Sequence, residues 1–217
     1  MTPLRTRLRS IPSFPSELPT FPVEDAPGEP LPLLLEWLNG AIDAGVLLPH
    51  AVTLSTVAVD GTANARTLIV KDLTSDGVVF ATRTDGVKAA ELERVPQAAI
   101  TFYSRELGRQ VRLRGPVRRE SDDTAHADEN TRPPHSRAAG RIGRQSSPMS
   151  SRSDYVRLFR AEVERVEAGD QTSSGLWAVY TVLPENVEFW ASTPQEGQIR
   201  LAYTLTDGSW TRSLLWP

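Results

Sequence analysis

Cysteine is absent from this chain of 217 residues, and histidine occurs only three times. Without thiols the chain forms no disulfide, has no thiolate nucleophile and builds no cysteine-based zinc or iron–sulfur site. Lysine is almost missing as well, because Lys71 and Lys88 are the only lysines among 24 basic residues. These absences exclude several kinds of chemistry and leave a chain whose 39% hydrophobic and 24% charged residues are ordinary for a globular protein.

Charge and hydropathy limit the expected partners. The 27 acidic residues outnumber the basic ones, and the net charge of −3 gives no general attraction to nucleic acid. No stretch approaches the roughly 20 apolar residues of a membrane span. Arg5, Arg7 and Arg9 are followed by Pro12 and Pro15, where a signal peptide needs an apolar run. We therefore expect a cytoplasmic protein with no nucleic-acid or membrane partner.

The chain divides by composition at residue 32. Residues 1–32 hold 8 of the 17 prolines, and we expect a mobile or extended arm without helices. Apolar residues recur at helical spacing from Leu33, with Gly45 as a C-cap, so a helix begins the second part. Residues 33–217 are expected to form one domain.

Short segments rich in β-branched residues follow, with turn signals such as Asp60-Gly61 and Asp207-Gly208. Short helices are expected at 88–94 and, capped by Ser153, through about 167, whereas residues 121–152 have few large apolar side chains and predict a polar loop. So many short strands joined by tight turns indicate a mainly β fold, an antiparallel barrel with peripheral helices. The expected strands span 51–59, 78–82, 98–103, 110–118, 177–183, 187–192, 199–205 and 210–215. One further strand, after the Asp60-Gly61 turn, is expected to end near residue 73.

Two early segments place cations at candidate anion-binding positions. Arg66 and Lys71 end the segment RTLIVK, whose interior is apolar on both faces. These cations either reach solvent or pair with an anion such as phosphate. Thr82, Gly86 and Lys88 lie at the start of a predicted helix, where they form either an ordinary cap or a phosphate cradle.

Two later segments are also open to two interpretations. The Arg-rich stretch 132–157 has no aromatic residue before Tyr155, which disfavours single-strand nucleic-acid binding and leaves a solvated loop or a polar ligand site. Trp190, ten residues before Arg200, is either a core residue or one wall of a site for a planar heterocycle. No Ser–His–Asp set, paired-carboxylate motif, Walker loop or GxGxxG motif is visible, so an enzyme here would rely on a bound cofactor.

Together, four motifs resemble the pyridoxamine 5'-phosphate oxidase family of FMN-binding split barrels: RTLIVK at 66–71, RQV at 109–111, RP…S…RQSS at 132–147 and EFW…R at 188–200. The resemblance runs from about residue 33 to residue 217. It implies an FMN-dependent oxidoreductase and a homodimer whose two active sites are built by both subunits. It implies no catalytic side chain, because flavin N5 carries the chemistry.

The resemblance also assigns cofactor contacts. Val87 stands where the family has an arginine, which removes one charge from the phosphate site, whereas both lysines of the chain fall on the FMN site. The implied contacts with the flavin and its ribityl phosphate are Arg66, Thr67, Leu68, Ile69, Val70, Lys71, Ala81, Thr82, Lys88 and Gln110, with Gln145, Ser146, Trp190 and Arg200 from the other subunit.

The implied substrate side departs from the family pattern. Besides Lys71, Arg132 and Ser136 match residues that hold the substrate phosphate in the family. Asp128 replaces a tyrosine, however, and Glu196 and Gln198 replace an arginine and a histidine. The two carboxylates disfavour an anionic, phosphorylated substrate by Coulomb repulsion.

We therefore expect an FMN-dependent oxidase that removes hydride from a small cyclic, non-pyridoxal substrate in a biosynthetic, phenazine-like pathway of secondary metabolism. O2 is the expected oxidant of the reduced flavin. Two alternatives remain, a pyridoxamine/pyridoxine 5'-phosphate oxidase with an altered substrate pocket and a non-catalytic flavin-binding protein.

Overall fold

The computed structural model describes residues 3–194 and 196–217, which form two compact units. Unit 1 contains the N-terminal residues up to 53 together with Ile100–Arg114 and Pro184–Pro217. Unit 2 contains Leu54–Ala99 and Gly115–Leu183. The two units therefore alternate along the chain, and several strands contribute to both of them.

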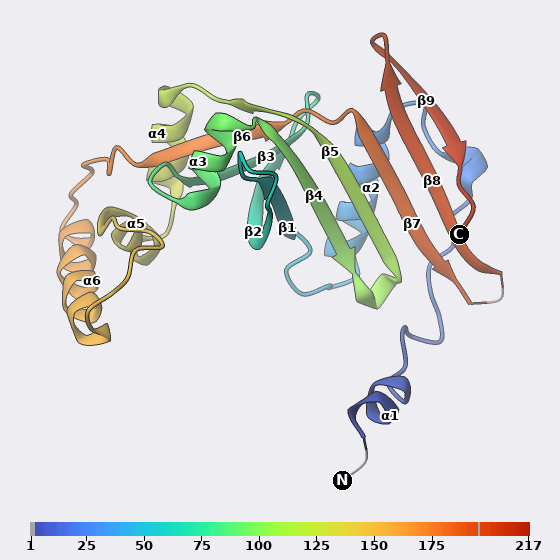
Figure 1. Cartoon of the computed structure of the whole chain (residues 1–217), viewed down its shortest axis with the longest axis horizontal. Helices are drawn as coiled ribbons and strands as arrows, with labels where there is room; N and C mark the ends of the chain where they lie inside the picture. The colour runs from blue at the N-terminus through green and yellow to red at the C-terminus, as the bar shows by residue number, and fades with distance from the viewer. Residues whose placement is uncertain (1–2, 195) are drawn as a thin grey trace. The chain divides into compact units, whose positions relative to one another are not determined.

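The strands of the described residues follow the order β4-β1-β2-β3-β6-β5-β7-β8-β9, and β4 also pairs with β5 (Figure 1). That additional pairing closes six strands into a barrel, and β7, β8 and β9 continue from β5. The predicted antiparallel split barrel is confirmed. The strands are β1 Ala51–Val57, β2 Ala63–Leu73, β3 Val78–Arg83, β4 Gln97–Ser104, β5 Arg109–Arg119, β6 Trp177–Val182, β7 Asn186–Thr193, β8 Gly197–Thr206 and β9 Ser209–Leu214.

Helix α2 (Pro30–Asp43) supplies the core of unit 1. Its Trp37 ring packs edge-on against Phe21 and Phe189, with ring centroids 4.9 and 5.1 Å away, and Phe189 packs in turn against Tyr203. All four side chains are buried. Aromatic groups of this size contribute most of the apolar area that such a core removes from water.

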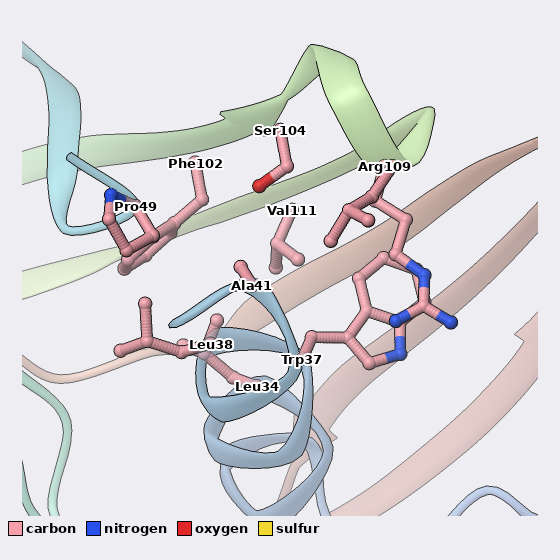
Figure 2. A pocket seen from close by; sticks show the side chains of 10 residues that line it. Leu34, Trp37, Leu38, Ala41, Pro49, Phe102, Ser104, Arg109 and Val111 are labelled. Atoms are coloured by element: carbon pink, nitrogen blue, oxygen red, sulfur yellow. The ribbon is translucent and has the colours of Figure 1, made fainter. Parts of the chain in front are cut away.

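Figure 2 shows a small pocket in unit 1 between α2 and strands β4 and β5. Leu38 and Trp37 line it from the helix and Phe102 and Val111 from the strands, and the guanidinium of Arg109 lies 4.3 Å from the centre of the Trp37 ring. The enclosed volume of ≈20 Å³ is close to the minimum for one water molecule. This pocket is therefore a detail of core packing rather than a ligand site.

Unit 2 packs four helices around its strands: α3 (Val87–Arg94), α4 (Asp122–Thr131), α5 (Pro134–Arg141) and α6 (Arg152–Glu167). Its core includes Val78, Phe80 and Val182, whose side chains are fully buried, and the Phe80 ring stacks on Tyr180 at 5.5 Å. Strands β3 and β6 pair along their whole length, from Val78 opposite Val182 to Arg83 opposite Trp177.

The predicted turns are confirmed by backbone geometry. Gly45 has a φ of +69° just after α2, and Asp207 and Gly208 have φ values of +51° and +76° between β8 and β9. Two successive positive φ values match the twist of a tight hairpin. Where both ends of a strand were predicted, each end lies within two residues of the observed end, and the same holds for the helix at 88–94.

The predicted loop at 121–152 is wrong as far as residue 141, because this part contains α4 and α5. These helices lack the large apolar side chains that make a helix visible as a periodic pattern. Ser121 caps α4 by accepting a hydrogen bond from the Thr124 amide at 3.2 Å, and Pro134 occupies the first turn of α5. The buried Glu129 fastens α4 to residues 173 and 174.

Two further predictions need correction. Residues 1–32 are not free of helix, because Leu4–Arg9 form α1 in the proline-free interval after Pro3, and Val23–Asp25 form a 3-10 turn. Helix α2 also begins at Pro30 rather than at Leu33 as predicted. Helix α6 is capped by Ser151 rather than Ser153, since the Ser151 hydroxyl accepts the Asp154 amide at 3.1 Å. The boundary between arm and domain at residue 32 stays a prediction. In the described ranges, no helix combines the length and apolar character needed to cross a membrane.

Candidate functional site

A cavity of ≈610 Å³ opens in unit 2 along β2, β3 and the start of α3. That volume is typical of a small-molecule site. Eight of the residues that the resemblance assigns to the cofactor line it: Arg66, Thr67, Leu68, Ala81, Thr82, Lys88, Gln145 and Ser146. Gln145 and Ser146 were expected from the other subunit, but they line the cavity of their own chain.

Arg66 is fixed by a buried polar network. Its guanidinium donates to Thr56 Oγ1 at 2.6 Å and to Glu91 Oε2 at 3.1 Å, and Glu91 also accepts hydrogen bonds from Thr56 and from Asn64 Nδ2. Burial by itself raises the pKa of Glu91, but the hydrogen bonds from Thr56, Asn64 and Arg66 outweigh it, and the pKa lies below its ordinary value. Glu91 therefore stays ionised and holds Arg66 at the cavity wall.

Lys88 and Thr82 form a second donor set. Lys88 Nζ donates to Thr82 Oγ1 at 3.0 Å, which joins the first turn of α3 to the end of β3. Burial lowers the pKa of Lys88, and the nearby charge of Arg66 lowers it further. Two cations held close together in a partly buried cavity attract an anion, which relieves their repulsion.

The loop before α3 and the loop after α5 meet at Asp85. Arg83 forms a bidentate ion pair with Asp85, with both N–O distances at 2.8 Å. The backbone amide of Gln145 donates to the same carboxylate at 3.4 Å. Ser146 adopts a φ of +63°, a backbone conformation that residues other than glycine rarely adopt. A Cβ atom at Gly86 would lie 2.6 Å from Gln145 Oε1, so glycine at position 86 leaves room for that side chain.

A third cluster surrounds Trp177. Lys71 Nζ lies 3.1 Å from Asp128 Oδ1, and Asp128 Oδ2 accepts a hydrogen bond from Trp177 Nε1 at 2.8 Å. The Arg132 guanidinium stacks 3.8 Å above the Trp177 ring. Asp128 and Arg132 therefore both contact Trp177, and Lys71 joins this cluster through Asp128. The sequence alone predicts only a strand at Trp177, with no functional role.

In unit 1, strand register aligns three predicted flavin contacts. Gln110 on β5 lies opposite Trp190 on β7, and Trp190 lies opposite Arg200 on β8. Arg200 is held by Glu188, which accepts from its Nε and Nη2 at 3.1 Å each. The Trp190 indole donates to Gln198 Oε1. Cross-strand partners project from the same face of a sheet, so this row forms one continuous polar and aromatic surface.

The other predicted site residues take no part in the contacts described above. Ile69 is 40% exposed and Val70 is buried in the core, on opposite faces of β2. Ser136 lies in α5 and Glu196 just before β8. The residues that sequence reasoning missed are Arg83, Asp85, Glu91 and Trp177. Their roles depend on contacts with other segments, and the only local signal was the position of Glu91 three residues after Lys88 on the same face of a helix.

The fold and this cavity define an antiparallel split-barrel protein with a cation-lined site suited to a phosphorylated ligand. Residues 38–169 match the family model described as pyridoxamine 5'-phosphate oxidase. Residues 177–217 match the model of the pyridoxine 5'-phosphate oxidase C-terminal dimerisation region. The chain belongs to the pyridoxamine 5'-phosphate oxidase family, and it is an oxidoreductase.

Similar proteins include the pyridoxine/pyridoxamine 5'-phosphate oxidase of Rhodococcus jostii, 38% identical over 189 residues, which cover 86% of this chain and 84% of the relative. The enzyme of the same description from Erythrobacter litoralis is 32% identical over 193 residues, covering 87% and 91%. Among solved structures, PhzG from Burkholderia lata, in complex with tetrahydrophenazine-1-carboxylic acid, superposes with a TM-score of 0.87 at 26% identity, covering 92% of this chain and 98% of PhzG.

Proposed function

We propose that this chain is an FMN-dependent oxidase that removes hydride from a small planar cyclic substrate lacking the phosphate of pyridoxine 5'-phosphate, in a phenazine-like biosynthetic pathway. FMN is the cofactor, and when bound it supplies the hydride acceptor, with O2 as the proposed oxidant of the reduced flavin. The chain's own residues bind and orient the two reactants and exclude water, so no side-chain nucleophile is required.

The cofactor phosphate is assigned to the donor sets at the start of α3. Lys88, Thr82 and Arg66 offer cationic and hydroxyl donors to one side of the cavity, and the neighbouring Gln145 and Ser146 offer polar groups from the 143–147 loop. Charge-assisted hydrogen bonds of this kind are the strongest that neutral-pH side chains make with phosphate. The donor chemistry of the cavity therefore fits FMN.

The Lys71–Asp128 ion pair carries the proposal on substrate class. Lys71 is the substrate-side lysine implied by the family resemblance, and here the carboxylate of Asp128 lies 3.1 Å from its Nζ. A dianionic phosphate at this place would have to displace Asp128 or lie beside it, and either arrangement costs electrostatic energy. A neutral ring system meets no such penalty, and a singly charged one meets a smaller penalty than a dianion.

A second candidate function is oxidation of pyridoxine or pyridoxamine 5'-phosphate with an altered pocket. Two relatives with this description share 32% and 38% identity with the chain. Arg132 also lines the cavity, and it is one of the residues that the family resemblance links to the substrate phosphate. A third candidate is a flavin-binding protein without turnover. It predicts that no substrate reduces the bound flavin.

A homodimer is part of the proposal. Residues 177–217 match the dimerisation region of the family and include Trp190 and Arg200. We infer that Gln110 contacts the flavin held by its own subunit, whereas Trp190 and Arg200 contact the flavin held by the second subunit. Sedimentation of the holoenzyme at micromolar concentration tests the assembly, since a monomer that still turns over would contradict it.

The deciding experiment compares substrates on the purified yellow holoenzyme. Anaerobic mixing with a reduced phenazine carboxylate should bleach the flavin band, and admission of air should restore it. Pyridoxine 5'-phosphate should be oxidised at least about 100-fold less efficiently, measured as kcat/KM from pyridoxal 5'-phosphate formation. Robust turnover at micromolar pyridoxine 5'-phosphate would favour the second candidate, whereas a flavin that no substrate reduces would favour the binding protein.

A further inference from the structure

Two arginines in the cavity each have a buried nitrogen without a hydrogen-bond partner among the described residues: Arg83 Nη1 and Arg132 Nη1. Arg83 is 8% exposed, and its other two guanidinium nitrogens are both used by Asp85. Leaving a charged donor buried and unpaired costs free energy, so each of these two nitrogens lacks an acceptor that its own side chain's described partners do not supply.

Trp177 brings the two arginines together. Arg83 on β3 lies directly opposite Trp177 on β6, so their side chains project from the same face of the sheet. Arg132, at the C-terminal end of α4, stacks on the same indole with its guanidinium carbon 3.8 Å from the ring centre. All three residues line the cavity of ≈610 Å³.

Neighbouring residues fix the positions of the two arginines. Gly140 in α5 leaves space for Arg132, because a Cβ atom there would lie 2.9 Å from Arg132 Nη1. The bidentate pair with Asp85 fixes the plane of the Arg83 guanidinium and so fixes the direction of its remaining nitrogen. Burial lowers the pKa of Arg132, the carboxylates of Glu129 and Asp128 oppose that shift, and the nearby charge of Arg83 adds to it. The contribution of Arg83 is a repulsion that an anion between the two arginines would relieve.

This pair differs from the donors of Lys88 and Thr82. Arg83 follows Thr82 directly in β3, and successive side chains of a strand point to opposite faces. Lys88 binds on the Thr82 side, whereas Arg132 lies on the Trp177 side. The cavity therefore has two cationic regions.

We propose that Arg83 and Arg132 form a two-arginine site for an oxyanion carried by a bound ligand. Guanidinium groups bind planar carboxylates and phosphates with two or more acceptor oxygens. Two ligands bring such a group: the substrate with a ring carboxylate, or the cofactor with its phosphate. The inference rests on the proposed function, because that function supplies both candidate ligands. Its test measures binding and needs no turnover.

The experiment compares two matched ligand pairs that differ in charge. FMN and riboflavin are titrated into apoprotein, and phenazine-1-carboxylate and its carboxamide into the FMN-loaded protein, with dissociation constants from fluorescence quenching. In R83M or R132M, the charged member of one pair should bind about tenfold or more weakly, whereas its uncharged partner changes by less than about twofold. A loss confined to FMN assigns the phosphate, and a loss confined to the carboxylate assigns the substrate.

Two controls separate an anion site from a structural ion pair. R94M removes an exposed arginine at the end of α3 and should leave all four constants unchanged. R83M/D85N removes the whole ion pair, so it leaves no unpaired carboxylate behind. If this double variant regains wild-type affinity for the charged ligands, R83M acted only by exposing Asp85, and the proposal is overturned. The proposal is overturned as well if wild-type protein prefers neither charged ligand, or if both charged ligands keep their wild-type affinity in R83M and in R132M.

Discussion

Lys88 Nζ donates a hydrogen bond to Thr82 Oγ1 at 3.0 Å, so one of the two lysines of the chain is held at the end of β3 rather than in solvent. The contact leaves the ammonium with two further donors, and it lies in the same cavity as Arg66. Its charge is therefore available to an anion, but it depends on pH more than an exposed lysine would.

The affinity for FMN should fall at alkaline pH. Burial, with the charge of Arg66 in second place, lowers the pKa of Lys88 below 10.5, so the ammonium loses its proton earlier than an exposed lysine does. As pH rises through that lowered pKa, the dissociation constant of FMN should increase, about tenfold in total. In K88R it should stay flat, because arginine remains charged. Riboflavin, titrated in parallel between pH 7 and 10, reports any change in the ring system alone, and an identical slope for both flavins would contradict the assignment.

Glu91 should contribute stability that is lost in acid. Its pKa in the folded protein is lowered from 4.5, so the unfolded state binds the proton more readily. The contribution is complete above about pH 4.5 and disappears as pH falls through the lowered folded value. The free energy of unfolding of E91Q should therefore be about 1–3 kcal/mol lower than that of wild type at pH 7. This difference in stability should become smaller below pH 4.5. Urea unfolding at both pH values measures this, with E93Q on the exposed side of α3 as the control. A gap that is independent of pH would refute the role of the charge.

Gly86→Ala should weaken cofactor binding without unfolding the protein. The new Cβ meets Gln145 Oε1 at 2.6 Å, but the obstacle is the far end of a flexible side chain, and the φ of −92° at Gly86 suits alanine. We expect the melting temperature to move by less than about 3 °C, as is usual when strain is relieved by a rotamer change. The dissociation constant of FMN should rise about as much as in Q145A. Additive losses in G86A/Q145A would show that the two substitutions act independently.

Asp128→Asn should improve the use of phosphorylated substrates. The amide oxygen of asparagine can still accept the Trp177 indole hydrogen bond, so the variant removes the charge that pairs with Lys71 and little else. The KM of pyridoxine 5'-phosphate should fall about tenfold, which corresponds to one charge-assisted contact. Unphosphorylated pyridoxine should be unaffected. D123N, on the exposed face of the same helix, provides the comparison, and an equal change in both variants would point to net charge alone.

Much of the barrel is predictable from sequence because its signals are local. Alternating β-branched residues and turns such as Asp207-Gly208 locate the strands to within a few residues. Helices α4 and α5 were missed because their stability comes from a cap and from tertiary contacts. Glu129, for example, accepts hydrogen bonds from Ser173 and Ser174, more than forty residues away in sequence.

The candidate site was predictable only where family motifs mark it. Arg66, Thr82 and Lys88 were assigned by resemblance, and the structure gathers them at one cavity. Arg83 carries no such mark, because its importance depends on Asp85, on the cross-strand position of Trp177 and on an unpaired nitrogen. Pairings of this kind are set by the fold, and a single sequence does not reveal them.

The register that lines up Gln110, Trp190 and Arg200 also limits how this enzyme can evolve. Substitution at any one of the three positions changes a single group and leaves its neighbours in place. Insertion or deletion of one residue within β7 would instead exchange the faces of the strand, turning the buried Phe189 outward and Trp190 into the core. The contacts proposed for the flavin can therefore change here through point mutations, whereas length changes should be confined to the connecting turns.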